Sequence, residues 1–240
     1  MATLYHINKI HKLSSYGNNN FMILEGGIFM RIPKHIGVIP DGNRRWAVNN
    51  GLTKEMGYNS GIDPGLQLFK QCEKYGIKEI TYYGFTVDNT KRPTIQKHAF
   101  IKACIDAVNI LTKENADLLV IGNTTSSSFP KELLPFTKRR TFGKGGIKVN
   151  FLVNYGWEWD LKSLLNNSNN KLKDSLRSKD ISRIDLIIRW GGRRRLSGFL
   201  PVQSVYSDFY VIEDLWPEFK QHHLEDALEW YNNQDITLGG

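Results

Sequence analysis

Residues 35–46 combine side chains that could hold a diphosphate. An apolar run over 36–39 predicts a short buried strand, and Pro40 ends it. Asp41 then lies at the carboxyl end of a strand, where open α/β sheets place their ligands. Gly42 lets the backbone approach a ligand closely. The turn into a helix follows, with free N–H groups pointing to the same place, and it carries Asn43, Arg44 and Arg45.

One carboxylate, two guanidiniums and a helix N-terminus are the groups that a metal-bound diphosphate needs. The acid would hold the cation, while the arginines and backbone amides would hold the phosphate oxygens. A β-turn with Asp41 as N-cap and two surface arginines explains the same residues. This stretch alone leaves both interpretations open.

Polar residues also follow two later predicted strands. Asn89 and Arg92 come after a strand predicted over 80–85, and Arg189 ends a strand predicted over 184–189. Because the carboxyl ends of parallel strands share one edge of a sheet, we expect these side chains in one arginine-rich crevice.

Arginines at strand ends require an explanation, because an unpaired buried guanidinium is costly. Ion pairs with Asp88 and Asp208 are one explanation, and a bound anion is the other. The residues by themselves do not choose between them.

Predicted strands alternate with predicted helices along the chain. The further strands are expected at 118–121, at 147–153 and around Val211, and the helices at 46–50, 59–75, 94–113, 130–140, 158–166 and 224–231. This order is typical of an α/β domain with a mostly parallel sheet and helices on both faces. We therefore assign residues 33–240 to one domain.

The N-terminal residues 1–32 are predicted to form a helix and a linker. Apolar residues recur at helical spacing through residues 1–15 and predict a short amphipathic helix, and residues 16–20 are polar. Packing on the domain and docking on a membrane are both compatible with this helix.

Composition narrows the class of protein. The chain has 240 residues and a formal net charge of +8 at pH 7, which favours an anionic partner. Nucleic acid is not expected, because no zinc-finger, RNP or helix-turn-helix spacing occurs. Cys72 and Cys104 lie in apolar helical patterns and predict buried thiols. Without a signal peptide or an apolar run near the ~20 residues that span a bilayer, we expect a cytoplasmic protein.

Further motifs are spaced along the chain in a fixed order. They are Tyr82–Pro93, Asn154–Gly156, Asp185–Gly192, Asp208–Tyr210, Leu215–Pro217 and Gly239–Gly240. Together with residues 35–46 they resemble the cis-prenyltransferases, the undecaprenyl diphosphate synthase family. The resemblance implies an α/β fold with a hydrophobic tunnel, prenyl diphosphate substrates, Mg²⁺ as cofactor and a homodimer. It also implies peripheral membrane contact through the product.

The same resemblance implies roles for individual residues. Asp41 resembles the aspartate that holds magnesium and diphosphate, and Asp208 stands where the family usually has a metal-binding Glu. Asn89 and Arg92 resemble the catalytic pair that orients the allylic diphosphate while its C–O bond breaks. The residues expected around that diphosphate are Gly42, Asn43, Arg44, Arg45, Lys54 and Tyr58. Those expected along the tunnel are Trp46 and Phe85, and those expected around the acceptor are Arg189, Trp190, Arg195 and Ser197.

The sequence departs from the family pattern mostly on the acceptor side. The family's Arg-Thr-Gly-Gly-Glu-x-Arg reads Arg-Trp-Gly-Gly-Arg-Arg-Arg over residues 189–195, so a large ring and a reversed charge appear. The C-terminal Arg-x-Gly, which in the family reaches across a dimer, reads Thr-Leu-Gly over 237–239. Donor-side changes are smaller: Lys54 replaces Arg, Tyr58 replaces His, Asp88 replaces Glu and Thr90 replaces Trp.

We therefore expect a prenyltransferase that ionises an allylic prenyl diphosphate (dimethylallyl, geranyl, farnesyl or longer) and has relaxed acceptor choice. The acceptor would be isopentenyl diphosphate, a second allylic diphosphate in non-head-to-tail condensation, or a hydroxyl compound. A standard head-to-tail cis-polyprenyl diphosphate synthase is the first alternative. A non-catalytic partner subunit is the second, and the retained donor motif argues against it.

Overall fold

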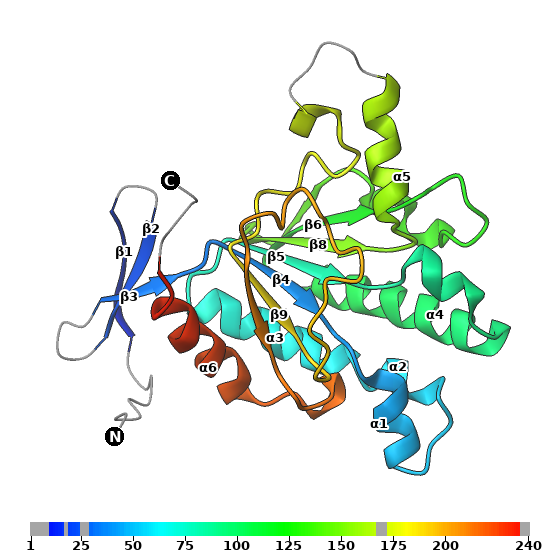
Figure 1. The fold of residues 1–240 in the computed structure, drawn as a ribbon, viewed down its shortest axis with the longest axis horizontal. Helices are drawn as coiled ribbons and strands as arrows, with labels where there is room; N and C mark the ends of the chain where they lie inside the picture. The colour runs from blue at the N-terminus through cyan, green and yellow to red at the C-terminus, as the bar shows by residue number, and fades with distance from the viewer. Residues whose placement is uncertain (1–9, 17–18, 25–28, 167–171, 236–240) are drawn as a thin grey trace.

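The computed structural model describes residues 10–16, 19–24, 29–166 and 172–235 (Figure 1). Within these residues seven strands form one sheet in the order β10-β9-β4-β5-β8-β6-β7, parallel except for the edge strand β7. The strands are β4 (His35–Ile39), β5 (Glu79–Tyr83), β6 (Ala116–Ile121), β7 (Arg140–Phe142), β8 (Ile147–Leu152), β9 (Leu186–Arg189) and β10 (Asp208–Val211). The predicted α/β class with a mostly parallel sheet is confirmed.

Strand β4 lies inside the sheet, next to its central strand β5. It is buried along its whole length and pairs with β9 on one side and β5 on the other. Ile36 and Val38 belong to one core cluster, and Ile39 belongs to the other, as the alternation of a strand requires. Gly37 faces the second cluster, where a Cβ would lie 2.6 Å from the ring of Phe199. A side chain therefore has no room there.

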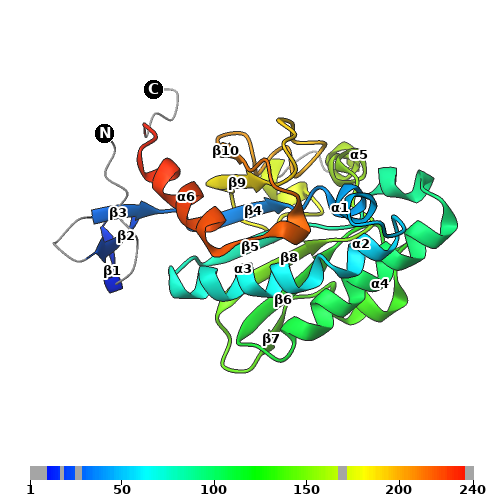
Figure 2. The same cartoon turned by 90° about the horizontal axis from the view of Figure 1, so that it is seen from below.

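The two faces of the sheet are covered differently. One face packs against α3 (Ile62–Lys74), α4 (Thr94–Leu111) and α6 (Gln221–Asn232), and α3 lies beside α4 (Figure 2). The other face packs mainly against the irregular segments that flank β9, at 176–185 and 196–204, with α5 (Trp157–Leu161) at its margin. No helix in the described ranges is long and apolar enough to cross a membrane.

Helix boundaries follow local backbone chemistry. Pro64 lies in the first turn of α3, and Gly76 follows its end with φ +68°, as predicted from their types. The helix predicted over 130–140 is instead a 3₁₀ helix η2 (Lys131–Phe136) followed by β7, because Pro135 prevents regular α-helical bonding. The helix predicted over 158–166 divides into α5 and the 3₁₀ helix η3 (Lys162–Asn166).

The predicted N-terminal helix is wrong for residues 10–15, and residues 1–9 lie outside the described ranges. A three-stranded antiparallel sheet forms there from β1 (Ile10–Tyr16), β2 (Asn19–Leu24) and β3 (Phe29–Ile32). Apolar spacing alone could not detect it, because the backbone bonds come from strand partners later in the chain.

Strand β3 is joined to the last turn of α6. The Arg31 guanidinium donates to the carbonyl oxygen of Tyr231 at 2.5 Å and lies 3.8 Å from the centre of that ring. Met30 and Ile32 are buried in the main core cluster. Residues 30–32 are therefore part of the packed body rather than of a linker.

A buried polar network crosses β4, β5 and β8. His35 Nδ1 lies 3.2 Å from the carbonyl oxygens of Ser182 and Arg183, so it carries the ring proton. His35 Nε2 then accepts a bond from the Thr81 hydroxyl at 2.8 Å, and Asn150 donates to that hydroxyl. Burial lowers the pKa of His35, against the opposing effect of Glu79. The folded protein therefore holds this histidine neutral.

We predict that His35 makes the fold less stable in acid. The unfolded chain takes up a proton below about pH 6.5 and the folded chain does so only at lower pH, so stability falls as the pH drops below about 6.5. The difference in unfolding free energy between wild type and His35→Gln should shrink by up to about 1.4 kcal/mol per pH unit. Denaturant titrations from pH 8 to about 5 measure it, and a constant difference contradicts the prediction.

Candidate functional site

Three strand ends meet at one edge of the sheet. Ile39 is in register with Arg189, and Val38 with Tyr82, so β4, β9 and β5 end side by side. A polar cleft of about 710 Å³ opens there. Of the residues predicted for a site, those that line the cleft are Asp41, Gly42, Asn43, Arg44, Arg45, Lys54, Tyr58, Asn89, Arg92, Arg189, Arg195 and Ser197. The expected crevice at the strand ends is therefore present.

Asp41 forms ion pairs with two arginines. Its Oδ2 accepts a bond from Arg189 Nη2 at 2.7 Å, and its Oδ1 lies 3.5 Å from Arg45 Nη2. Arg189 is buried and also donates to the Ser197 hydroxyl at 3.0 Å, but its Nε has no partner among the described residues. One guanidinium thus connects the acid after β4 with the loop after β9.

Asn43 and Gly42 form the start of α1 (Asn43–Asn49). Gly42 has φ +111°, and no side chain in the described part of the chain caps the helix. The Asn43 amide donates to the Pro40 carbonyl at 3.1 Å, while its buried Oδ1 has no partner within that same part. The unsatisfied acceptor therefore belongs to a side chain shared by the cleft and the space beside Gly61, two residues after Asp41.

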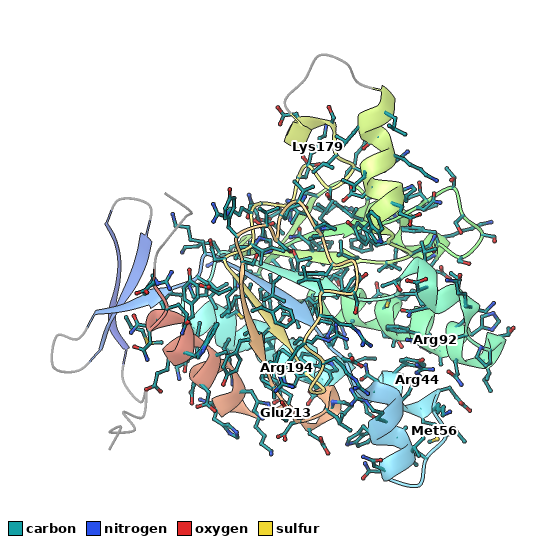
Figure 3. The ribbon with its side chains drawn as sticks, in the orientation of Figure 1. Arg44, Met56, Arg92, Lys179, Arg194 and Glu213 are labelled. Carbon is teal, nitrogen blue, oxygen red and sulfur yellow. The ribbon has the colours of Figure 1, made fainter. Side chains whose placement is uncertain are left out.

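Arg92 lies at the junction of charged and aromatic side chains. It donates to the Tyr58 hydroxyl at 2.9 Å, and its guanidinium carbon is 5.5 Å from the centre of the Phe100 ring. Burial lowers the pKa of Arg92, and nearby Arg44 lowers it further (Figure 3). The charge on Arg92 is thus incompletely compensated by the protein, so a bound anion would stabilise the charged form of this guanidinium.

Asn89 supports the loop that carries Arg92. Its Oδ1 accepts the backbone N–H of Thr86 at 3.0 Å and so caps the 3₁₀ helix η1 (Val87–Lys91). Arg92 follows directly after η1. Asn89 therefore fixes the turn that points Arg92 at Tyr58.

The cleft has an excess of positive charge. It is lined by six basic side chains, Arg44, Arg45, Lys54, Arg92, Arg189 and Arg195, and by two acidic ones, Asp41 and Asp88. Such a balance in a concave site concentrates anions. The anion-binding explanation for the arginines is therefore favoured, although Arg189 and Arg45 are paired with Asp41 in this structure.

An apolar cavity of about 80 Å³ adjoins the cleft. Both spaces are lined by Pro40, Asn43, Tyr58, Gly84 and Phe100. Beyond these, the cavity runs between α3, α4 and the sheet, with Leu66, Ala103, Cys104 and Ala107 in its wall. Burial raises the pKa of Cys104 to about 12, so this wall is uncharged, as predicted for a buried thiol.

The two predicted tunnel residues do not line the cavity. Phe85 is fully buried and packs edge-on against Phe100, at 5.6 Å between ring centres, so it supports the wall from behind. Trp46 is half-buried on α1 and lines neither space. Trp216 lines the cavity instead, and its indole donates to the Gly61 carbonyl at 2.8 Å.

Trp190 does not face the cleft. Strand alternation turns it away from Arg189, and it is buried against Trp216 at 4.7 Å between ring centres. Its indole N–H donates to His223 Nδ1 at 3.3 Å. The large ring that the sequence suggested for the acceptor site therefore belongs to the core beneath α6.

Asp208 is not brought to Asp41 within this chain. It begins β10 in register with Leu186, whereas Val211 is in register with Arg189 at the site edge. Three strand residues, or about 10 Å, separate these levels. Burial raises the pKa of Asp208, which also disfavours its charged form.

Tyr83 and Thr86 had no role predicted from the sequence, whereas Asp88 was predicted as an ion-pair partner of the arginines and instead pairs with Lys91. Tyr83, Thr86 and Asp88 line the cleft, and the Tyr83 hydroxyl donates to the Ser197 carbonyl at 2.8 Å. Asp88 and Thr86 lie within the quoted motif at 82–93, which was the available signal. The predicted C-terminal segment 237–240 lies outside the described residues.

The acidic residues suit a hard cation that also binds substrate. Among the described residues no group of three His, Cys, Asp or Glu side chains could hold a metal by itself. Mg²⁺ usually binds one or two carboxylates, keeps several waters and takes substrate phosphates as its other ligands. Asp41 in an open cationic cleft fits that mode of binding.

Comparisons with known proteins agree with this geometry. The family model described as a putative undecaprenyl diphosphate synthase matches residues 39–239. An isoprenyl transferase of Clostridium tetani is 33% identical, with 87% of this chain and 90% of the relative covered. A ditrans,polycis-undecaprenyl-diphosphate synthase of Aliivibrio fischeri, specific for (2E,6E)-farnesyl diphosphate, is 29% identical, with 95% and 94% covered.

A solved structure supports the fold. Lavandulyl diphosphate synthase from Lavandula x intermedia, in complex with dimethylallyl diphosphate, aligns with a TM-score of 0.75 at 21% identity, covering 87% of this chain and 98% of that one. With a cationic cleft beside an apolar cavity and a family match over nearly the whole domain, the chain belongs to the undecaprenyl diphosphate synthase family and is a prenyltransferase of the cis-prenyltransferase type.

Proposed function

We propose that the enzyme ionises an allylic prenyl diphosphate in the cleft and transfers the prenyl group to an acceptor held near Arg189. The observation that carries this proposal is the direct junction of a cationic cleft with an apolar cavity. A prenyl diphosphate has the same two parts, an anionic head and a hydrocarbon chain. Such a substrate bridges both spaces through the five residues that they share.

The donor head would bind the arginines around α1 and η1. Arg44, Arg45 and Lys54 supply donors to the diphosphate, and Arg92 binds the oxygens that gain charge as the C–O bond breaks. Asp41 would hold Mg²⁺, with Asp88 as the second acid of the cleft. Bound Mg²⁺ would supply Lewis-acid stabilisation of the leaving diphosphate.

The prenyl transfer step requires no oxidant or reductant. The C–O bond of the donor breaks, and its electron pair leaves with the diphosphate oxygen. A double bond or a hydroxyl of the acceptor supplies the pair for the new bond, and a proton is then lost. The apolar cavity keeps water away from the cation-like prenyl group, which would otherwise be hydrolysed.

The acceptor would be held by Arg189, Arg195 and Ser197, which line the same cleft. Relaxed acceptor choice is proposed, because Arg193 replaces a Glu in the loop that follows Arg189. Head-to-tail condensation with isopentenyl diphosphate is the competing function. It is favoured by the burial of Trp190, which leaves the arginines of the acceptor side unobstructed. We also propose the homodimer and the peripheral membrane contact that the family resemblance implies.

The decisive experiment is product analysis with labelled donors. Dimethylallyl, geranyl and farnesyl diphosphates are each incubated with Mg²⁺ alone, with isopentenyl diphosphate or with an alcohol. We expect prenyl products in at least one combination, and condensation of dimethylallyl diphosphate with itself would support relaxed choice. Exclusive use of isopentenyl diphosphate would rule out relaxed choice, and the lack of any prenyl product would overturn the function.

We predict that Asp41→Asn lowers kcat by at least about 100-fold, because the carboxylate charge that holds the cation is lost. Asp106→Asn is the matched control, since Asp106 lies on α4 away from the cleft, in an ion pair with Lys102. The control should keep nearly full activity. Equal losses in the two variants would show that the charge of Asp41 has no special role.

Gly191 brings the β9 loop against the donor side. It has φ +82°, and its carbonyl accepts a bond from Arg45 Nη2 at 2.8 Å. A Cβ at this position would collide with that nitrogen and would lie 3.1 Å from the Asp41 carbonyl oxygen. Only glycine combines this backbone angle with this contact.

We predict that Gly191→Ala displaces Arg45 and reduces both stability and prenyl transfer. Gly51→Ala is the control, because Gly51 also has positive φ but no described heavy atom within 4 Å of the methyl group that the substitution adds. Gly191→Ala should cost about 1 kcal/mol more unfolding free energy than Gly51→Ala, because the backbone strain is common to both and the bond from Arg45 to the Gly191 carbonyl is lost only in the first. Urea denaturation measures the difference, and equal costs would contradict the contact argument.

A further inference from the structure

A stacked aromatic pair lines the entrance from the cleft to the apolar cavity. The rings of Tyr58 and Phe100 lie 4.5 Å apart with an angle of 6° between their planes. Arg92 holds the Tyr58 hydroxyl at 2.9 Å, and Phe85 packs edge-on against Phe100. The two rings are therefore held in place and form one side of the entrance, opposite Pro40, Asn43 and Gly84, and a prenyl chain that leaves the cleft has to pass them.

One stripe of α4 forms the long wall of the cavity. The stripe starts at Phe100, continues through small side chains and ends in two large ones: Ala103, Cys104, Ala107, Ile110 and Leu111. These positions recur at helical spacing of three and four residues. The wall is therefore apolar throughout and is closed by branched side chains at its far end.

The far end separates the cavity from an outer groove. Ile62, Leu66 and Ile110 line both the cavity and a groove of about 500 Å³ between α3 and α4. Asp63, Asp106 and Lys113 also line this groove, which marks it as outer surface. Three apolar side chains are therefore the barrier between the interior and solvent.

The free space behind the entrance is small. Its volume of about 80 Å³ is close to half that of the roughly 150 Å³ engineered cavity that holds benzene, a molecule of six carbons. A dimethylallyl group has five carbons and therefore needs a far smaller expansion of this cavity than a longer prenyl group does. A farnesyl group has fifteen, and packed interiors do not yield space on that scale without moving whole side chains.

We propose that this cavity selects a five-carbon allylic donor, with Phe100 at the entrance and Ile110 at the closed end as the residues that limit chain length. The inference rests on the proposed function and names its donor class. It distinguishes this chain from its Aliivibrio relative, which is specific for farnesyl diphosphate.

The test compares dimethylallyl with farnesyl diphosphate in the wild type and in three variants. Phe100→Leu widens the entrance, Ile110→Ala opens the closed end to the outer groove, and Ile95→Ala is the matched control. Ile95 lies on the same helix but is 61% exposed and lines none of these spaces. The readout is the ratio of kcat/KM for the two donors, together with calorimetric binding of their unreactive thiolodiphosphate analogues.

We expect the wild type and Ile95→Ala to favour the five-carbon donor by at least about 100-fold. One extra methylene already gives about 10–200-fold discrimination in an apolar pocket, and a farnesyl group adds ten carbons. Ile110→Ala and Phe100→Leu should each lower that ratio by about tenfold or more and allow the farnesyl analogue to bind. Binding is measured in each variant beside its thermal unfolding, so loss of fold is recognised separately.

The inference is overturned if the wild type accepts farnesyl diphosphate equally well, or if opening either end leaves the ratio unchanged. Failure of the proposed function gives a different pattern. The short analogue then binds in preference to the long one, but no donor yields a transferred product. If neither analogue binds, the cavity does not receive prenyl chains and both proposals fail.

Discussion

The ion pair between Asp41 and Arg189 joins the ends of two neighbouring strands, and the cleft is arranged around it. The Arg189 side chain is 5% exposed and that of Asp41 is 33% exposed, so the acid is the more accessible partner. A guanidinium at this depth is stable only while an anion compensates it. The protein supplies Asp41 for that purpose, and the open side of the same carboxylate faces the cleft.

Two spaces of opposite character meet within a few residues of this pair. The cleft carries charge and donors, whereas the cavity behind Tyr58 and Phe100 is lined almost entirely by carbon. The boundary between the two spaces is formed by Pro40, which follows β4, and Gly84, which follows β5. Gly84 has no room for a side chain, because a Cβ would lie 2.9 Å from the Leu152 carbonyl oxygen. A substrate with a charged head and an apolar tail is thereby oriented without further recognition elements.

Much of the sheet could be predicted from the sequence, because apolar runs such as 36–39 carry their own signal. The strands β1 to β3 and β7 could not, since their pairing depends on residues distant in the chain. Asp41, Arg92 and Arg189 could be placed at one edge from the sequence, because the carboxyl ends of parallel strands share it, and all three line the cleft. The motif around Trp190 predicts an acceptor-side residue, but the alternation of side chains along β9 directs this ring into the core.

The hydrogen bonds of Arg189 also determine whether the free-energy effects of substitutions around it add up. Its one guanidinium bonds the Asp41 carboxylate, the Arg195 carbonyl and the Ser197 hydroxyl, from two different loops. When two groups share a hydrogen-bond partner, the free-energy effects of substituting them do not add, because removing one group lets the shared partner bond more closely to the other. In a double-mutant cycle, changes at Asp41 and Ser197 would therefore yield a coupling energy even though no direct bond joins the two side chains.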